Sequence, residues 1–168
     1  VNGLRQDLQV AHETVQRWLL MLENVYMIFR ILPFGAPHIR AVKKEAKHYH
    51  YDWTLIEEPG IRFENFMACQ LQAFWHYQQD YEGLDREIRF FRDVDRREVD
   101  FVLMLNGKPT HFIECKTKQK SVNPALKYLL KRFPDTQALQ VSPEAHESYM
   151  TKEGIQCLSA VEFLGGLF

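Results

Sequence analysis

The chain has 168 residues, of which 46% are hydrophobic and 13% aromatic, and its formal net charge is −1 at pH 7. This composition supplies enough apolar surface for a folded core and excludes a disordered chain. A near-neutral charge creates no global basic field, so a nucleic-acid partner would have to be bound by a local basic patch.

Three features of the sequence bear on the cellular compartment. The cysteines Cys69, Cys115 and Cys157 are far apart and form no C-x-x-C pair, which argues against a zinc knuckle or a disulfide framework and favours a reducing cytosol. No apolar run approaches the roughly 20 residues of a membrane span, and no signal peptide is visible. We therefore expect a cytoplasmic protein that does not contact a membrane. Because the first residue is Val1 and not Met, we also expect the chain to be a fragment of a longer protein.

Residues 4–34 are expected to form two helices and the start of a strand. An amphipathic spacing of i, i+3, i+4 and i+7 is shown by Val15, Trp18, Leu19 and Leu22. The tight connection before this helix has helix-turn-helix spacing. Residues 26–32 are apolar and rich in strand formers, and 41–51 can return as a second strand. A winged-helix-like segment is therefore predicted over residues 1–52.

Three lysines, Lys43, Lys44 and Lys47, concentrate positive charge on the predicted hairpin of this segment. A winged helix can place such a hairpin on DNA phosphates, so these lysines are candidate nucleic-acid contacts. The alternative is a solvated hairpin in a module that only packs against a neighbour. That alternative is slightly favoured, because Arg17 is the single base on the predicted recognition helix.

A longer amphipathic helix is predicted from Phe63 to about Tyr77, after the break at Pro59-Gly60. Its apolar face comprises Phe63, Phe66, Met67, Leu71, Phe74 and Trp75, and its polar face comprises Asn65, Gln72, His76 and Gln79. Glu64 projects inside the apolar arc. A carboxylate that faces a core requires a cation, a metal or a hydrogen-bond partner.

The remaining sequence predicts alternating strands and helices. The expected strands cover 86–92, 98–105, 110–116, 138–141 and 155–158, and the expected helices cover 124–133 and 161–164. Asn106-Gly107 is a strong hairpin signal between the second and third of these strands. Together with the preceding helix, this order predicts a mixed α/β sheet with helices on its faces.

Asp100, Glu114 and Lys116 form the candidate catalytic centre. Side chains alternate along a strand, so Glu114 and Lys116 share a face. If Leu105 pairs with Pro109 around a three-residue loop, Asp100 lies opposite Glu114, with Cβ atoms about 4.5–5.5 Å apart. Two carboxylates at that separation are unfavourable unless a cation lies between them, which predicts Mg²⁺ or Mn²⁺ held by Asp100 and Glu114.

Further oxygen and nitrogen groups can complete this centre. The backbone carbonyl of Cys115 could supply another metal ligand, while its side chain is expected to face the core. Lys116 would orient or help to deprotonate the attacking water, and Glu64 would join as an outer acidic residue. The competing interpretation is an exposed Glu–Lys ion pair on a strand, which contributes little. The combination of Asp-x13-Glu-x-Lys with an inward-facing helical Glu favours the site.

Weaker candidates surround this centre. Lys118 and Lys120 extend its basic side and are candidate phosphate contacts, or else they lie at a solvated strand end. His48 and His50 alternate along a predicted strand, a spacing that can bind metal, but a wing or an edge strand is the favoured location. The sequence has no phosphate-binding G-x-x-x-x-G-K-[ST], so no ATP site is expected within it.

The chain resembles the C-terminal region of prokaryotic AAA-type ATPases that end in a restriction-endonuclease-like domain of unknown function. The resemblance extends over nearly the whole chain and is carried by segments 15–32, 47–52, 60–65, 98–102, 113–116 and 161–164. It implies a PD-(D/E)XK nuclease-like fold over residues 53–168, with Glu64, Asp100, Glu114 and Lys116 as site residues. It also implies an ATPase module that precedes this region in the same polypeptide.

Two functions follow as expectations. The first is Mg²⁺-dependent hydrolysis of DNA phosphodiester bonds by the nuclease-like domain. The second is a non-catalytic module that docks DNA or a protein partner for the ATPase. The chain differs from the family pattern at Val99, because the pattern has a proline immediately before the acidic residue that corresponds to Asp100. That proline carries no chemistry. The sequence does not select an oligomeric state.

Overall fold

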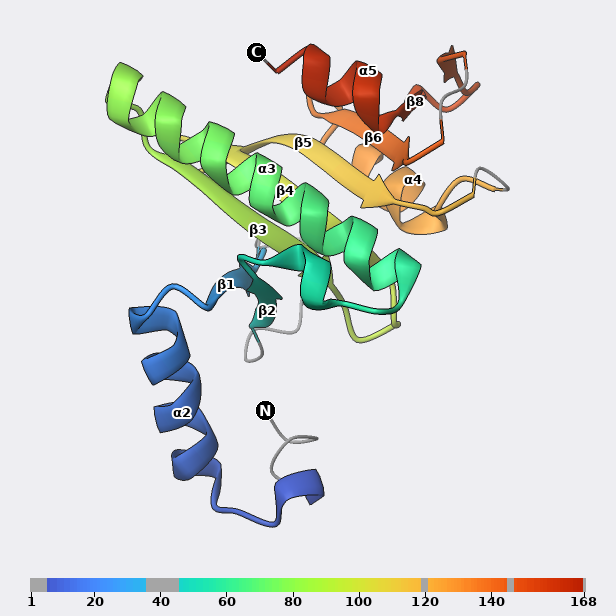
Figure 1. Ribbon diagram of the computed structural model, residues 1–168. Coiled ribbons are helices and arrows are strands. Elements are labelled where there is room, and N and C mark those ends of the chain that lie inside the picture. Colours follow the sequence, from blue (N-terminus) through green and yellow to red (C-terminus); the bar gives the residue numbers. More distant parts are fainter. Residues whose placement is uncertain (1–5, 36–45, 119–120, 145–146, 168) are drawn as a thin grey trace.

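The computed structural model describes residues 6–35, 46–118, 121–144 and 147–167. Its centre is an eight-stranded sheet in the order β2-β1-β3-β4-β5-β6-β8-β7. The mixed α/β class predicted from the sequence is therefore confirmed. Figure 1 shows the long helix α3 across one face of this sheet and α2 standing away from it.

The N-terminal elements are a helix and a hairpin. Helix α2 (His12–Asn24) leads to strand β1 (Ile28–Pro33), which pairs antiparallel with β2 (Lys47–His50). Strand β1 also pairs in parallel with β3, so this hairpin belongs to the central sheet. The predicted boundary at residue 52 thus falls between elements that share one sheet, and the division into 1–52 and 53–168 stays a prediction.

Helix α2 differs from its predicted packing. Val15 is buried and Leu19 and Leu22 are half-buried, but Trp18 on the same stripe is 44% exposed. Among the described elements, α2 makes its main contacts with β1, so its apolar stripe is only partly covered. The winged-helix interpretation stays a prediction.

Helix α3 (Pro59–Glu82) is longer at both ends than the predicted 63–77. It follows the short 3-10 turn η1 (Trp53–Leu55). The Glu58 carboxylate accepts hydrogen bonds from the backbone N–H groups of Gly60 and Ile61, and Pro59 occupies the first turn. Gly83, with a φ of 69°, ends the helix in the left-handed conformation.

The predicted polar face of α3 requires one correction. Asn65 is only 2% exposed, because its side-chain amide bonds both the backbone N–H and the carbonyl of His50 on β2, at 2.8 and 2.6 Å. A polar residue is tolerated there because these two bonds satisfy it.

Strands β3 (Arg86–Arg92), β4 (Glu98–Leu105) and β5 (Lys108–Cys115) form an antiparallel meander close to the predicted ranges. The loop between β4 and β5 contains two residues rather than the predicted three, since Leu105 pairs with Lys108. Asn106 and Gly107 have φ values of 49° and 75°, as a tight primed turn requires.

A bulge in β5 compensates for the shorter loop. The register shifts between the Leu103–His111 and Met104–Pro109 pairs, which leaves one extra residue in β5. Beyond the bulge, Phe101 pairs with Ile113, which is the register expected from a three-residue loop. The predicted loop was therefore wrong, but the register that it implied is observed as far as the Phe101–Ile113 pair. The pairing of Asp100 with Glu114 stays a prediction.

The C-terminal elements complete the sheet and its two faces. They are α4 (Pro124–Leu130), β6 (Gln137–Ser142), β7 (Tyr149–Met150), β8 (Ile155–Ser159) and α5 (Ala160–Gly165). Strands β5, β6 and β8 run parallel, and β7 was not predicted. Helices α3 and α5 share one hydrophobic cluster, whereas α4 packs in a second cluster on the opposite face. Among the described helices, none is both long and apolar enough to cross a bilayer.

Candidate active site

Asp100 and Glu114 lie at one end of the β4–β5 ladder, where the sheet brings them together. Phe101 pairs with Ile113, and Asp100 and Glu114 are the next residues at this end of the two strands. Strand β4 also bulges against β3 between Val99 and Val102, next to Asp100. The backbone N–H of Cys115 donates to Asp100 Oδ2 at 2.9 Å, which fixes one carboxylate oxygen. The two residues are only 8% and 4% exposed. The chain thus holds two carboxylates side by side and away from solvent.

This proximity changes the acidity of both groups. Burial, followed by the negative charges of Glu114 and Glu64, raises the pKa of Asp100 to about 7, although Lys47 opposes the rise. Burial also raises the pKa of Glu114, while Lys116 and the Asn123 side chain partly offset this effect. A pair of buried carboxylates disfavours double ionisation, and a nearby cation relieves that cost.

Lys116 follows on the same strand edge. Its Nζ lies 2.5 Å from Glu114 Oε1, and its side chain is 42% exposed. Burial disfavours the charged amine, but the hydrogen bond and charge of Glu114 outweigh it and raise the pKa of Lys116. Lys116 therefore presents a protonated ammonium at the border between the buried carboxylates and solvent.

Glu64 reaches the same region from α3, as its position inside the apolar arc suggested. Glu64 Oε1 accepts hydrogen bonds from Lys47 Nζ at 2.9 Å and from the hydroxyl of Tyr49 at 2.7 Å. Both partners come from β2. The inward-facing, half-buried carboxylate is therefore compensated by a cation and a hydroxyl.

Lys47 is the clearest difference from the sequence-based expectation. Its Nζ lies 2.7 Å from Glu98 Oε1, 2.9 Å from Glu64 Oε1 and 3.2 Å from Asp100 Oδ1, and its side chain is only 16% exposed. Although burial opposes the charged form, Asp100, Glu64 and Glu98 together raise the pKa of Lys47. The ammonium faces the acidic centre and not the outer surface, because three carboxylates attract it there.

Glu98 is a further residue of this centre, and the sequence analysis assigned it no role. It binds Lys47 and also pairs with Arg92 Nε at 2.9 Å. Burial is the largest influence on its pKa, yet the bonds from Arg92 and Lys47 outweigh it and lower that pKa. Its position two residues before Asp100 on one strand was the available signal.

The other candidate residues are spread around this centre. Lys43, Lys44 and Lys120 lie outside the described residues. Lys118 is exposed just after β5. His48 and His50 lie on β2, an edge strand of the sheet, and His48 Nε2 is 3.9 Å from Glu23 Oε1. The Cys115 side chain packs against the core cluster beneath α3, as expected, and burial raises the pKa of its thiol.

The donor set fits a divalent ion held by two carboxylates. Glu114 Oε2 is buried and has no hydrogen-bond partner among the described residues, so it is an acceptor available to a cation. A hard ion such as Mg²⁺ takes one or two carboxylates and completes its shell with waters. Within the described ranges, no cluster of three or more His, Cys, Asp or Glu residues has metal-site geometry. A site here would therefore rely on Asp100 and Glu114.

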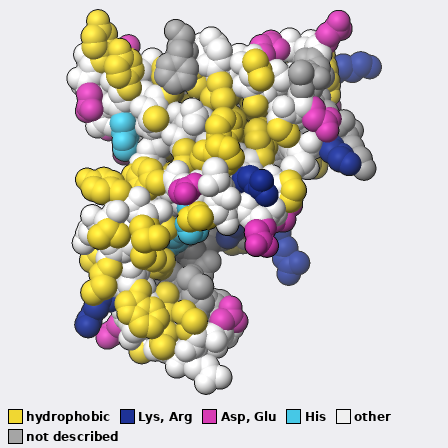
Figure 2. All heavy atoms as spheres, viewed as in Figure 1, with side chains coloured by type: hydrophobic (Ala, Val, Ile, Leu, Met, Phe, Trp, Pro, Cys, Tyr) yellow, Lys and Arg dark blue, Asp and Glu magenta, His cyan; other side chains and the backbone are white. Residues whose placement is uncertain are grey.

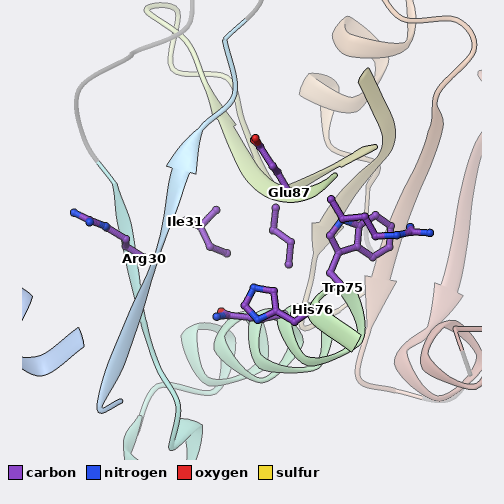
Figure 3. A pocket seen from close by; sticks show the side chains of 8 residues that line it. Arg30, Ile31, Trp75, His76 and Glu87 are labelled. Carbon is purple, nitrogen blue, oxygen red and sulfur yellow. The ribbon is translucent and has the colours of Figure 1, made fainter. Parts of the chain in front are cut away.

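A pocket of about 290 Å³ borders the centre directly, because Lys47, Tyr49 and Glu64 are among the residues that line it. An apolar pocket of about 610 Å³ begins where the chain leaves Lys116, and it is lined by residues that include Phe63, Phe66, Thr117 and Lys118. A smaller one of about 120 Å³ lies between β1, α3 and β3 (Figure 3). Arg30 and Ile31 border the smaller pocket on one side, but neither Asp100 nor Glu114 lines it.

Comparison with known families divides the chain into two matched segments. Residues 1–58 match a domain of unknown function, DUF8612, and residues 59–163 match a second domain of unknown function, DUF4143. Comparisons with curated proteins and with solved structures give no match. The second segment contains Glu64, Asp100, Glu114 and Lys116, whereas Lys47 lies in the first. The DUF4143 match covers more than half of the residues, so the chain belongs to the DUF4143 family.

Proposed function

We propose that residues 53–168 form a PD-(D/E)XK nuclease-like domain that hydrolyses DNA phosphodiester bonds with Mg²⁺ or Mn²⁺. The observation that carries this proposal is the convergence of Asp100, Glu114 and Lys116 at one strand end, with Glu114 Oε2 buried and unpartnered among the described residues. The two buried acids and the half-exposed lysine match the order and spacing of the acidic motifs in such nucleases.

Each residue has a distinct role in this proposal. Asp100 and Glu114 would hold the divalent ion, which supplies Lewis-acid stabilisation of the phosphate and a more acidic water. The Lys116 ammonium, at the solvent border, would orient that water and offset charge on the phosphate. Glu64, bound to Lys47 and Tyr49, would complete the acidic cluster from α3.

The wider setting is part of the same proposal. The resemblance to AAA-type ATPases suggests that this domain acts at the C-terminal end of such a protein, in the cytoplasm. Lys118, exposed next to the site, would contact a DNA phosphate, and Lys43, Lys44 and Lys120 are further candidates.

Cleavage of DNA by a Lys116→Ala variant tests this function. We expect the variant to fold normally, because Lys116 is half-exposed, but to lose metal-dependent cleavage of plasmid and oligonucleotide substrates. Lys152→Ala, which removes an exposed lysine far along the chain, is the matched control and should cut at the wild-type rate. Undiminished cleavage by Lys116→Ala would remove the lysine from the mechanism.

A second candidate function is protein docking without cleavage, and the exposed apolar surface of α2 supports it. Large apolar side chains are exposed along α2 and the turn that follows it, namely Trp18, Leu20, Met21, Val25, Tyr26 and Met27. Figure 2 shows hydrophobic side chains gathered over this part of the molecule. Contiguous exposed apolar surface marks an interaction site. Under this alternative, partner or DNA binding would survive Asp100→Asn, and no metal-dependent products would form.

A further inference from the structure

Lys47 stands out among the charged side chains because it binds three carboxylates at once. Glu98, Glu64 and Asp100 all lie within 3.2 Å of its Nζ. Among the described residues, Lys47 is the one cation within 4 Å of the Glu64 or Asp100 carboxylates. Its ammonium therefore supplies the positive charge that the buried Asp100 and the half-buried Glu64 need in the protein as it stands.

The backbone around Lys47 holds this ammonium in place. Tyr49, two residues later on the same strand face, donates its hydroxyl to Glu64. Asn65, next to Glu64 on α3, bonds both backbone groups of His50. These contacts clamp β2 onto α3, so the lysine is directed into the acidic centre by the sheet and not by a flexible side chain alone.

We propose that Lys47 is a resident counter-ion of the acidic centre, and that a divalent ion binds there by displacing its ammonium. This inference rests on the proposed metal site. The reason is geometric and electrostatic: Asp100 Oδ2 accepts from Cys115 N–H, and the Lys47 ammonium lies 3.2 Å from Asp100 Oδ1, so a cation that approaches Oδ1 meets a positive charge already in place. Like charges at a shared ligand oppose each other.

The inference assigns a role in the centre to the N-terminal hairpin. Strand β2 lies in the segment that matches a different family from the one that contains Asp100 and Glu114. A movement of β2 that withdrew Lys47 would leave Glu64 and Asp100 uncompensated and raise their affinity for a divalent ion. Lys47 is thus a positioning residue that sets how readily metal enters.

Calorimetric titration with Mn²⁺ tests this role in the whole chain. We expect Lys47→Gln, which keeps a hydrogen-bond donor but removes the charge, to bind Mn²⁺ at least about tenfold more tightly than wild type. Lys47→Arg, which keeps the charge, should bind like wild type. Lys152→Gln removes an exposed charge elsewhere and should also be unchanged. If wild type binds Mn²⁺ and Lys47→Gln binds it equally or more weakly, the proposed displacement of Lys47 would be overturned, while the metal site itself would stand.

The remaining outcomes separate this inference from the proposed function. Binding by Lys47→Gln but not by wild type would support displacement in its strongest form. An absence of binding in both would refute the metal site itself. If Lys47→Gln does not fold, the nuclear magnetic resonance signal of the Lys47 ammonium in wild type decides. Saturating Mg²⁺ should shift that signal while Lys152 stays constant, and an unmoved Lys47 signal would overturn the inference.

Discussion

Replacing Tyr49 by Phe should destabilise the protein by removing one buried hydrogen bond. The Tyr49 hydroxyl donates to Glu64 Oε1 at 2.7 Å, and Tyr49 is 5% exposed. The ring itself would remain, stacked on Phe29 with centroids 5.6 Å apart. The change therefore isolates the hydroxyl from the packing of the aromatic side chain.

The expected magnitude follows from the charge of the acceptor. A hydrogen bond to a charged group contributes about 1.5–3 kcal/mol, and loss of one partner leaves the other desolvated. Lys47 still compensates Glu64 in the variant, and Phe buries no hydroxyl, so we expect a net loss of about 1–2 kcal/mol. For a chain of this length, that loss lowers the melting temperature by about 2–8 °C.

Urea unfolding of wild type and Tyr49→Phe, followed by circular dichroism, measures this loss. Tyr81→Phe provides the matched control, because Tyr81 is 80% exposed on α3. Its unfolding midpoint should stay within error of wild type. If Tyr49→Phe were as stable as wild type, or if the control were equally destabilised, the proposed anchoring of Glu64 by β2 would be refuted.

Three further predictions concern the turn, the acidic pair and a half-buried histidine. Gly107→Ala should lower the unfolding free energy by about 1 kcal/mol, because its φ of 75° is unfavourable for a residue with a side chain, although the added methyl would clash with no atom. The control is Gly165→Ala, whose added methyl also meets nothing within 4 Å and which should leave the unfolding free energy unchanged. If both variants lost the same unfolding free energy, the strain argument would be contradicted. Glu114→Gln should raise the urea-unfolding free energy of the metal-free protein by about 1 kcal/mol, because burial raises the pKa of Glu114 and disfavours its charge. A clear loss of stability would show that the ion pair of Glu114 with Lys116 outweighs the cost of burying the charge. Burial lowers the pKa of His111, so the unfolded chain takes up a proton that the fold resists, and stability should fall as pH decreases through about 6.5. Comparison of unfolding free energies at pH 8 and pH 5.5 with those of His111→Gln isolates this contribution, and an unchanged pH dependence in that variant would exclude it.

Local sequence patterns determined most of the elements near the candidate site. The run of apolar strand formers in 98–105, which ends at a turn signal, predicted strand β4 with its observed ends, and the strand is buried on both faces. Asn106-Gly107 required a tight hairpin, since both residues adopt positive φ readily. The two signals together were sufficient to predict the register of β4 against β5 as far as Phe101 and Ile113, although the loop and the bulge in β5 were not anticipated.

Helix lengths were less predictable because their ends depend on caps. The apolar period of α3 marked its buried face, but the cap at Glu58 and the glycine at 83 extended it beyond the periodic region. Asn65 was assigned to the polar face by the same period. It is buried because the edge strand β2 offers both backbone groups to its amide, which no local pattern encodes.

What the sequence determined by itself was the α/β class, the order of the main elements and the register of the hairpin that ends next to the two acidic residues. These depend on side-chain period and turn chemistry, which act over a few neighbouring residues. Only the tertiary structure decided that β1 pairs with β3 and that Lys47 meets Asp100, a residue 53 positions away. Such contacts depend on burial and charge compensation between distant segments, so the lysine predicted to face DNA instead faces the acidic centre.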